Sequence, residues 1–201
     1  MQHSLFQLST GEIKHPQKPK SLKAFPDNYV VLDIETTGLN PRENEIIELS
    51  ALKVENNRVV QQFSTLVKPE GTISSYITSL TGITQSMTEN APDIKSAIKL
   101  FSDFCSDSII MGHNVKFDIS FINTNLEKHH NTHFSNDYVD TLRLARIYLK
   151  TLPNRKLGTI ASFFNLDTTG MHRGLKDCIV TNICFQKMKE MAKNASQNSI
   201  E

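Results

Sequence analysis

The sequence predicts an α/β fold in which helices flank a mixed β-sheet. The sheet is expected to begin as an antiparallel meander and to continue as strands that alternate with helices. Residues 29–67 carry three apolar, β-branched runs joined by short polar links, which favours the meander. From residue 92 onward, apolar residues recur three and four positions apart, with short apolar runs between these stretches. The 201 residues, of which 38% are hydrophobic, suffice for one domain with a sizeable core.

The expected elements follow in chain order. Strands are predicted at 29–35, 46–54 and 59–67; Asn56-Asn57 forms a turn between the last two, and Pro69 and Gly71 end the third. Short helical pieces follow at 75–80, and a helix begins near Pro92, with an inward stripe formed by Ile94, Ala97, Ile98, Phe101 and Phe104. Further strands are expected at 109–113 and 138–140, and further helices at 117–129, 141–149, 157–164 and 174–192. These strands bring the expected sheet to five.

Composition and charge limit the setting in which the protein works. The net charge of +1 gives no overall basic field, so a nucleic acid would have to be held by a local patch or through metal ions. The three cysteines form no CxxC pair, which favours a reduced, cytoplasmic protein without structural zinc. The sequence shows no membrane-spanning run and no signal peptide. We expect a flexible basic arm at residues 1–28, a globular domain at 29–192 and a disordered tail at 193–201.

The first strand carries two carboxylates that conflict with its apolar surroundings. Asp33 and Glu35 alternate with Leu32 and Ile34, and residues two apart on a strand project to the same face. Two such charges repel by about 4 kcal/mol at an effective dielectric of 20. A divalent cation would turn this repulsion into ligation, and hard oxygen ligands suit Mg²⁺ or Mn²⁺. The alternative is an edge strand whose polar face meets solvent.

Two later segments place further acidic residues and a histidine near the ends of elements. Asp118 follows the strand that ends at Gly112, in a position where ligand sites form in α/β sheets. His172 precedes the last helix, and Asp177 lies in its first turns. Each residue also has an ordinary explanation: a helix N-terminal aspartate favoured by the macrodipole, a surface histidine and a solvated helix residue.

The ordered motifs DIETTG, HNVKFD and HRGLKD resemble those of the DEDDh 3′–5′ exonucleases. This family includes the proofreading ε subunit of bacterial DNA polymerase III, the exonuclease domain of Gram-positive replicative polymerases, and ribonuclease T. The resemblance covers residues 29–190, with mild departures at Gly174 and Cys178, where alanine is usual. It implies a ribonuclease H-like fold and an exonuclease domain that removes nucleotides from the 3′ end of single-stranded DNA.

The same resemblance implies roles for individual residues. Asp33, Glu35, Asp118 and Asp177 would hold two divalent cations, Mg²⁺ or Mn²⁺, and His172 would be the general base. Such a pair of cations stabilises the attacking and leaving oxygens of phosphoryl displacement. The substrate contacts would come from Thr36, Thr37, Gly38, Leu39, His113, Asn114 and Phe117. Leu39 would act as a wedge and Phe117 would stack on a base; for both residues the alternative is a place in the core.

The N-terminal segment raises a separate question about partners. Gln2-His3-Ser4-Leu5-Phe6 resembles the short sliding-clamp-binding motif, with Gln2, Leu5 and Phe6 in matching positions and His3 in place of the usual leucine. A Leu-Phe pair on a flexible arm suits an apolar groove, and a disordered terminus is the alternative. The sequence also leaves open association with a DNA polymerase, homodimerisation, an RNA substrate, and a non-catalytic nucleic-acid-binding role. All four carboxylates and the histidine are present, which favours an active enzyme.

Overall fold

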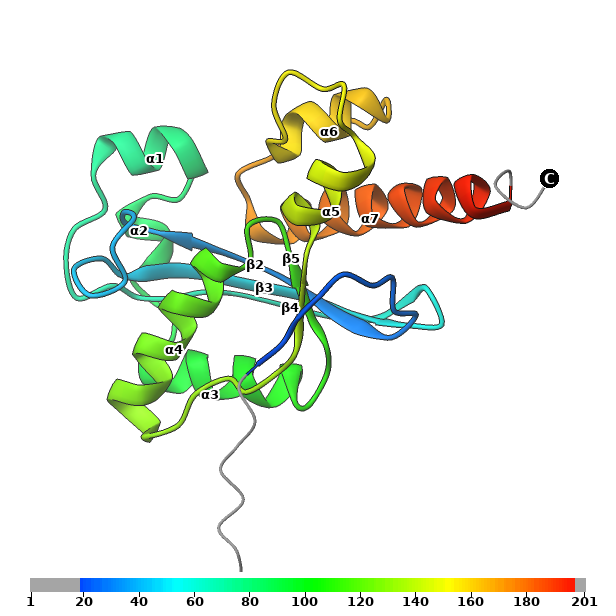
Figure 1. Ribbon diagram of the computed structural model, residues 1–201. Helices are drawn as coiled ribbons and strands as arrows, with labels where there is room; N and C mark the ends of the chain where they lie inside the picture. The colour runs from blue at the N-terminus through cyan, green and yellow to red at the C-terminus, as the bar shows by residue number, and fades with distance from the viewer. Residues whose placement is uncertain (1–18, 198–201) are drawn as a thin grey trace, which may run out of the picture.

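The computed structural model describes residues 19–197 and contains one mixed sheet with strand order β1-β6-β5-β2-β3-β4 (Figure 1). Strands β2 (Tyr29–Thr36), β3 (Ile46–Glu55) and β4 (Arg58–Leu66) form the predicted antiparallel meander. Strands β5 (Ile110–Gly112) and β6 (Tyr138–Asp140) add to β2 in parallel. The mixed α/β architecture is therefore confirmed.

The sheet contains six strands, so the prediction of five was wrong by one. The additional strand, β1 (Ser21–Leu22), pairs in parallel with β6. It lies inside the segment predicted to be a flexible arm, of which residues 19–28 are described. The Lys20 amide donates to the Asp137 carboxylate at 2.7 Å, and the Phe25 ring lies 5.3 Å from that of Phe185. This part of the predicted arm is docked on the domain.

Helices cover both faces of the sheet. Helices α3 (Ile94–Cys105) and α4 (Lys116–His130) lie on one face, and α5 (Thr141–Tyr148), α6 (Leu157–Phe163) and α7 (Gly174–Gln197) lie on the other (Figure 1). The short helices α1 (Ser75–Thr81) and α2 (Gln85–Thr88) lie beyond the end of the meander. Helix α7 extends past the predicted boundary at residue 192, so residues 193–197 are helical rather than part of a disordered tail.

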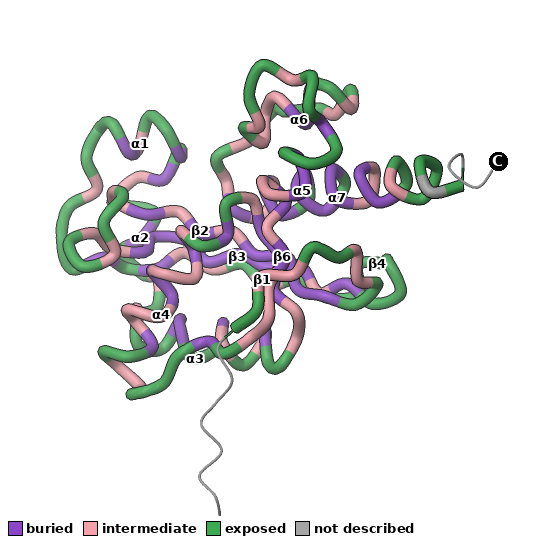
Figure 2. Tube along the Cα trace, viewed as in Figure 1, coloured by how far each residue is buried: buried purple, intermediate pink, exposed green. Residues whose placement is uncertain are grey.

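Strand β2 lies at the centre of the sheet, and its alternating side chains build two cores. Val30, Leu32 and Ile34 pack in the core beneath α3 and α4, whereas Tyr29 and Val31 pack beneath α5 and α7. Burial along the tube is densest where this strand crosses the domain (Figure 2). Strand β2 lies between β5 and β3, and Asp33 and Glu35 are half-buried, so the explanation of an edge strand with its polar face in solvent is wrong.

Two further observations bear on the predicted setting. Cys105, Cys178 and Cys184 are all buried free thiols, within two apolar cores. Among the described residues, no helix is both long and apolar enough to cross a bilayer.

Candidate active site

Three of the predicted carboxylates converge where β2 meets the start of α7. Each of Asp33, Glu35 and Asp177 offers a carboxylate oxygen, and these three oxygens lie within 4.8 Å of one another. Asp33 and Glu35 share the face of β2 that α7 covers, and Asp177 is in the first turn of that helix. The close packing depends on Gly174, because a Cβ at this position would lie 2.9 Å from the Cβ of Ser50 on β3.

The fourth carboxylate reaches the site from the opposite face of the sheet. Asp118 lies in the first turn of α4 and is only 5% exposed. Its Oδ1 accepts a hydrogen bond from the backbone N–H of Ile34, between the two β2 carboxylates, at 3.2 Å. The structure therefore brings all four predicted acidic residues around one segment of β2. Asp177 is only 7% exposed, so its explanation as a solvated helix residue is wrong.

Burial and mutual repulsion raise the pKa values of the carboxylates in this cluster. Burial, reinforced by the charges of Asp118 and Asp177, holds the pKa of Asp33 well above its usual range. Burial and the charge of Asp177 raise the pKa of Glu35 to about 8. Burial also raises the pKa of Asp118 to about 8, against the lowering effect of its backbone hydrogen bonds. A group of carboxylates that repel each other in this way is the donor set that a divalent cation stabilises.

One buried atom shows that these residues fit a metal. Oδ1 of Asp177 is buried and has no hydrogen-bond partner in the described part of the chain, while its Oδ2 accepts from the backbone N–H of His172 at 3.2 Å. Buried polar atoms are rarely left unpaired in proteins. A cation held by Asp33, Glu35 and Asp177 would supply the missing partner.

His172 lies at the mouth of a groove next to the acidic cluster. Its side chain is exposed and its backbone adopts a left-handed conformation, with φ of 67°. His172 and Asp177 line a groove of about 620 Å³, which continues along the first turn of α6. The backbone N–H of His172 donates to Asp177, so the predicted base borders the acidic cluster, and its side chain is exposed.

The loop after β2 contains the predicted contacts to a 3′ end. The backbone N–H of Thr37 donates to the carbonyl of Glu45 at 2.8 Å, and the Thr36 hydroxyl donates to the carbonyl of Gly38 at 2.6 Å. Gly38 allows a close approach, because a Cβ there would lie 2.6 Å from the side chain of Asn44. Leu39 is 84% exposed, which excludes the core alternative and leaves this large apolar side chain for a ligand.

The predicted substrate contacts on the turn between β5 and α4 differ in whether their side chains are accessible. Nε2 of His113 donates to the carbonyl of Arg155 at 2.8 Å, and Nδ1 lies 3.0 Å from the hydroxyl of Thr141. Burial keeps the pKa of His113 below its ordinary value, and the Thr141 hydroxyl that contacts Nδ1 also donates to the carbonyl of Gly112 at 3.1 Å. Neither ring nitrogen is then left for a substrate. The side chain of Asn114 is exposed, whereas Phe117 is half-buried, with its ring 5.0 Å from that of Phe121.

One pair of charged residues near the site was not predicted as functional. Glu48 on β3 lies opposite Glu35 in the register and is 2% exposed. Its carboxylate is 3.0 Å from Nη2 of Arg173, the residue after His172. The available signal was a glutamate within the apolar run Ile46-Ile47-Glu48-Leu49, which requires a buried partner.

The geometry defines a class of protein: an α/β domain with an acidic centre at the middle of its sheet that could hold a metal ion. Residues 30–185 match the RNase T exonuclease family, and the chain belongs to that family. It is 40% identical over 177 residues to the DNA polymerase III subunit epsilon of Aquifex aeolicus, covering 86% of this chain and 87% of that protein.

Other comparisons agree on the domain. The chain is 40% identical over 181 residues to the DNA polymerase III PolC-type of Caldanaerobacter subterraneus subsp. tengcongensis, covering 90% of this chain but only 13% of that much longer protein. Two solved structures share the fold: exonuclease X in complex with 5′ overhanging duplex DNA, and Escherichia coli exonuclease I in complex with a dT13 oligonucleotide. The first has a TM-score of 0.68 and 21% identity, covering 82% of this chain and 93% of that one. The second has a TM-score of 0.73 and 16% identity, covering 86% and 43%. The ribonuclease H-like fold and the exonuclease class expected from the sequence are confirmed.

Proposed function

We propose that this protein is a metal-dependent 3′–5′ exonuclease that removes nucleoside 5′-monophosphates from single-stranded DNA ends during proofreading or repair. The observation that carries the proposal is the convergence of Asp33, Glu35 and Asp177 within 4.8 Å, with one oxygen of Asp177 buried and unpaired among the described residues. Its similarity along 87% of a polymerase III epsilon subunit supports DNA as the substrate.

The four carboxylates would hold two divalent cations, Mg²⁺ or Mn²⁺. When bound, such cations stabilise the charge that develops on the attacking and leaving oxygens. Asp33 is central to the set because the charges of Asp118, Asp177 and Glu35 all act on its carboxyl group and raise its pKa. Asp118 also holds β2 in place through its hydrogen bond to the Ile34 amide.

His172 would remove the proton from the attacking water. A ring nitrogen of an imidazole can accept the proton of a water molecule, which is the task of a general base. Its accessible ring at the edge of the groove suits this role. Leu39, exposed on the loop after β2, would pack against the terminal base and keep the 3′ end unpaired.

The direct test is degradation of 5′-labelled single-stranded DNA and RNA of matched sequence by the wild-type protein and Asp33→Ala, with Mg²⁺, Mn²⁺ or EDTA. We expect a DNA ladder that shortens from the 3′ end and that EDTA and the substitution both abolish. Faster cleavage of RNA would replace DNA with RNA as the substrate. The absence of cleavage of either strand by folded wild-type protein would overturn the proposal of a stand-alone nuclease.

Two further proposals concern the setting in which the enzyme acts. We propose that it works in the cytoplasm beside a DNA polymerase, as the name of the Aquifex aeolicus relative suggests. We also propose that Gln2, Leu5 and Phe6, which lie outside the described residues, bind a sliding clamp. Clamp pull-down by the wild-type protein and by Leu5→Ala/Phe6→Ala tests the second proposal, and equal retention of both proteins would refute it.

A further inference from the structure

An ion pair between the buried Glu48, near the start of β3, and the half-exposed Arg173 joins that strand to the loop that carries the candidate base. Oε1 of Glu48 accepts from Nη2 of Arg173 at 3.0 Å, and Oε2 accepts from Nε of the same guanidinium at 3.4 Å. Oε2 also accepts from the backbone N–H of Gly174, the first residue of α7, at 2.9 Å. Both oxygens of one buried carboxylate are therefore committed to two consecutive residues at the start of this helix.

This ion pair links the carboxylates on β2 to the residues at the start of α7. Glu48 is level with Glu35 across the β2–β3 ladder, so its own strand fixes it relative to the β2 carboxylates. Arg173 directly follows His172, and Asp177 lies one turn further along α7. Asp177 and His172 are themselves joined by a hydrogen bond. Any shift of Arg173 and Gly174 would thus move the base and a metal ligand together.

Burial of a fifth carboxylate next to four others is unfavourable unless it has a specific task. Glu48 adds its charge to the field that Glu35 and Asp33 already experience. Arg173 is the cation that offsets this charge, and it also acts directly on Glu35. Replacing the ion pair with apolar residues would remove the repulsion, so its presence is not explained by stability alone.

We propose that Glu48 and Arg173 are positioning residues that hold His172 and Asp177 in register with Asp33 and Glu35. The inference rests on the proposed exonuclease function and assigns neither residue to contact with DNA or metal. It predicts that loss of the pair slows the chemical step and leaves binding of the strand largely unchanged, because Leu39 and the β5–α4 turn do not depend on it.

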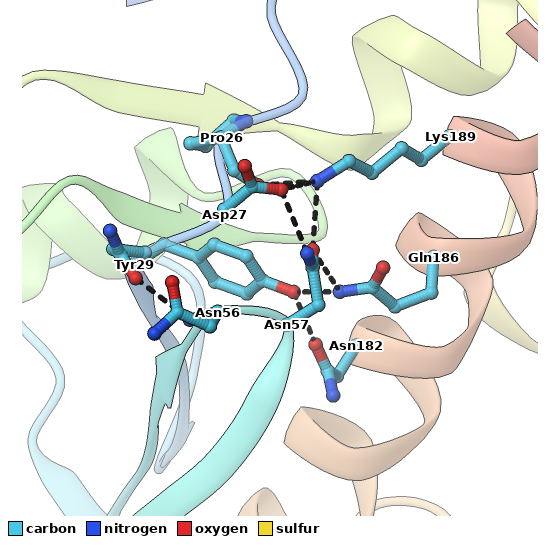
Figure 3. Close-up of polar contacts among 9 residues, drawn as sticks. Pro26, Asp27, Tyr29, Asn56, Asn57, Asn182, Gln186 and Lys189 are labelled. Carbon is cyan, nitrogen blue, oxygen red and sulfur yellow. Dashed lines mark hydrogen bonds and ion pairs between the residues drawn. The ribbon is translucent and has the colours of Figure 1, made fainter. Parts of the chain in front are cut away.

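The other end of α7 provides a matched control. Figure 3 shows the Lys189 side chain beside Pro26, Asp27 and Asn57. Its Nζ donates to the Pro26 carbonyl at 3.0 Å, to Oδ1 of Asn57 at 2.8 Å and to the Asp27 carboxylate. Lys189 is buried, so this network anchors the same helix to the same sheet through a charged pair remote from the acidic cluster. Its loss should weaken the fold without moving the base.

The experiment compares Glu48→Gln, Arg173→Lys and Lys189→Met with the wild type. In glutamine an NH₂ group replaces one carboxylate oxygen, so a donor then faces either Nη2 of Arg173 or the Nε of Arg173 and the N–H of Gly174, and the charge is lost. Lysine preserves the charge of Arg173 but not its two-point contact. The kinetic constants kcat and KM are measured on single-stranded DNA, at a temperature below the melting temperatures of the wild type and of all three variants. Hydrogen–deuterium exchange is measured for residues 172–178. We expect kcat to fall about 10- to 100-fold for Glu48→Gln, with KM within about 3-fold and faster exchange at this segment. Arg173→Lys should retain intermediate activity.

The alternatives give distinct results. The positioning role is refuted if Glu48→Gln keeps the wild-type kcat. It is also refuted if Lys189→Met lowers kcat as much as Glu48→Gln does. A rise in KM at unchanged kcat for Arg173→Lys would also overturn it, because the guanidinium would then act on the strand. If the wild type is inactive, exchange still tests the inference: slow exchange at residues 172–178 that Glu48→Gln alone accelerates supports it, and equal exchange refutes it.

Discussion

Replacing Glu35 with glutamine should stabilise the metal-free protein at alkaline pH, although it removes a proposed metal ligand. The pKa of Glu35 is raised from 4.5 to about 8 by burial and by Asp177 and Glu48. Between these values the folded protein retains a proton that the unfolded chain has lost. The slope of the unfolding free energy with pH is therefore negative, and the stability present below about pH 4.5 is lost as pH rises through about 8.

The rise in pKa sets the size of the effect. It corresponds to about 5 kcal/mol when the buried carboxylate is forced to ionise. This is an upper limit, because water still reaches a half-buried side chain and screens the repulsion. For a domain of this size, a gain of about 2–5 kcal/mol raises the melting temperature by roughly 5–15 °C. The substituted glutamine side chain would remain uncharged, so the difference should appear only above the ordinary pKa of glutamate.

The assay is thermal unfolding in EDTA at roughly pH 5 and roughly pH 8.5. Glu35→Gln should match the wild type at the lower pH and exceed it at the higher pH, and an excess of Mg²⁺ should raise the melting temperature of the wild type more than that of the variant. Glu190→Gln, which neutralises an exposed carboxylate on α7, serves as the control and should show no such difference. A variant no more stable than the wild type at the higher pH, in EDTA, would refute the reasoning that the carboxylates repel one another.

Three further predictions concern activity and stability. Asp33→Ala should lower kcat by at least about 1,000-fold with an unchanged far-ultraviolet circular dichroism spectrum, and retention of a tenth of the activity would contradict its central place in the acidic cluster. His172→Gln should lower kcat about 100- to 10,000-fold, and a variant that retains a tenth of the wild-type kcat would exclude His172 as the base. Lys189→Met should lower the melting temperature by roughly 3–10 °C, because it removes a buried charge that pairs with Asp27, and an unchanged melting temperature would show that this anchor is dispensable.

The parts of the fold predicted correctly from the sequence are those with long, regular patterns. The run from Tyr29 to Thr36 alternates two apolar faces, and its two carboxylates had to share one of them whichever strands lay beside it. Strand β1 could not be predicted in this way, because two residues carry no periodicity and its pairing with β6 depends on a contact across more than a hundred residues.

The site shows the same division between local and tertiary information. The motif around His113 gives no sign that both ring nitrogens are used by Thr141 and Arg155, since these partners come from distant elements. Glu48 was visible as a charge in an apolar strand, yet its partner Arg173 lies 125 residues further along the chain. The candidate metal-binding carboxylates can thus be predicted from residue type and spacing, whereas their supporting contacts require the folded structure.

The direction of β1 has a consequence for how the enzyme could be tethered. Ser21 is level with Tyr138, Ile110 and Val30, so residue 20 enters the sheet at the end opposite the carboxylates. Glu35 is then about 16 Å further along the strands and about 14 Å across them. The described chain therefore begins on the side of the sheet opposite the acidic cluster, so a tether joined at residue 19 would start away from the proposed site of cleavage.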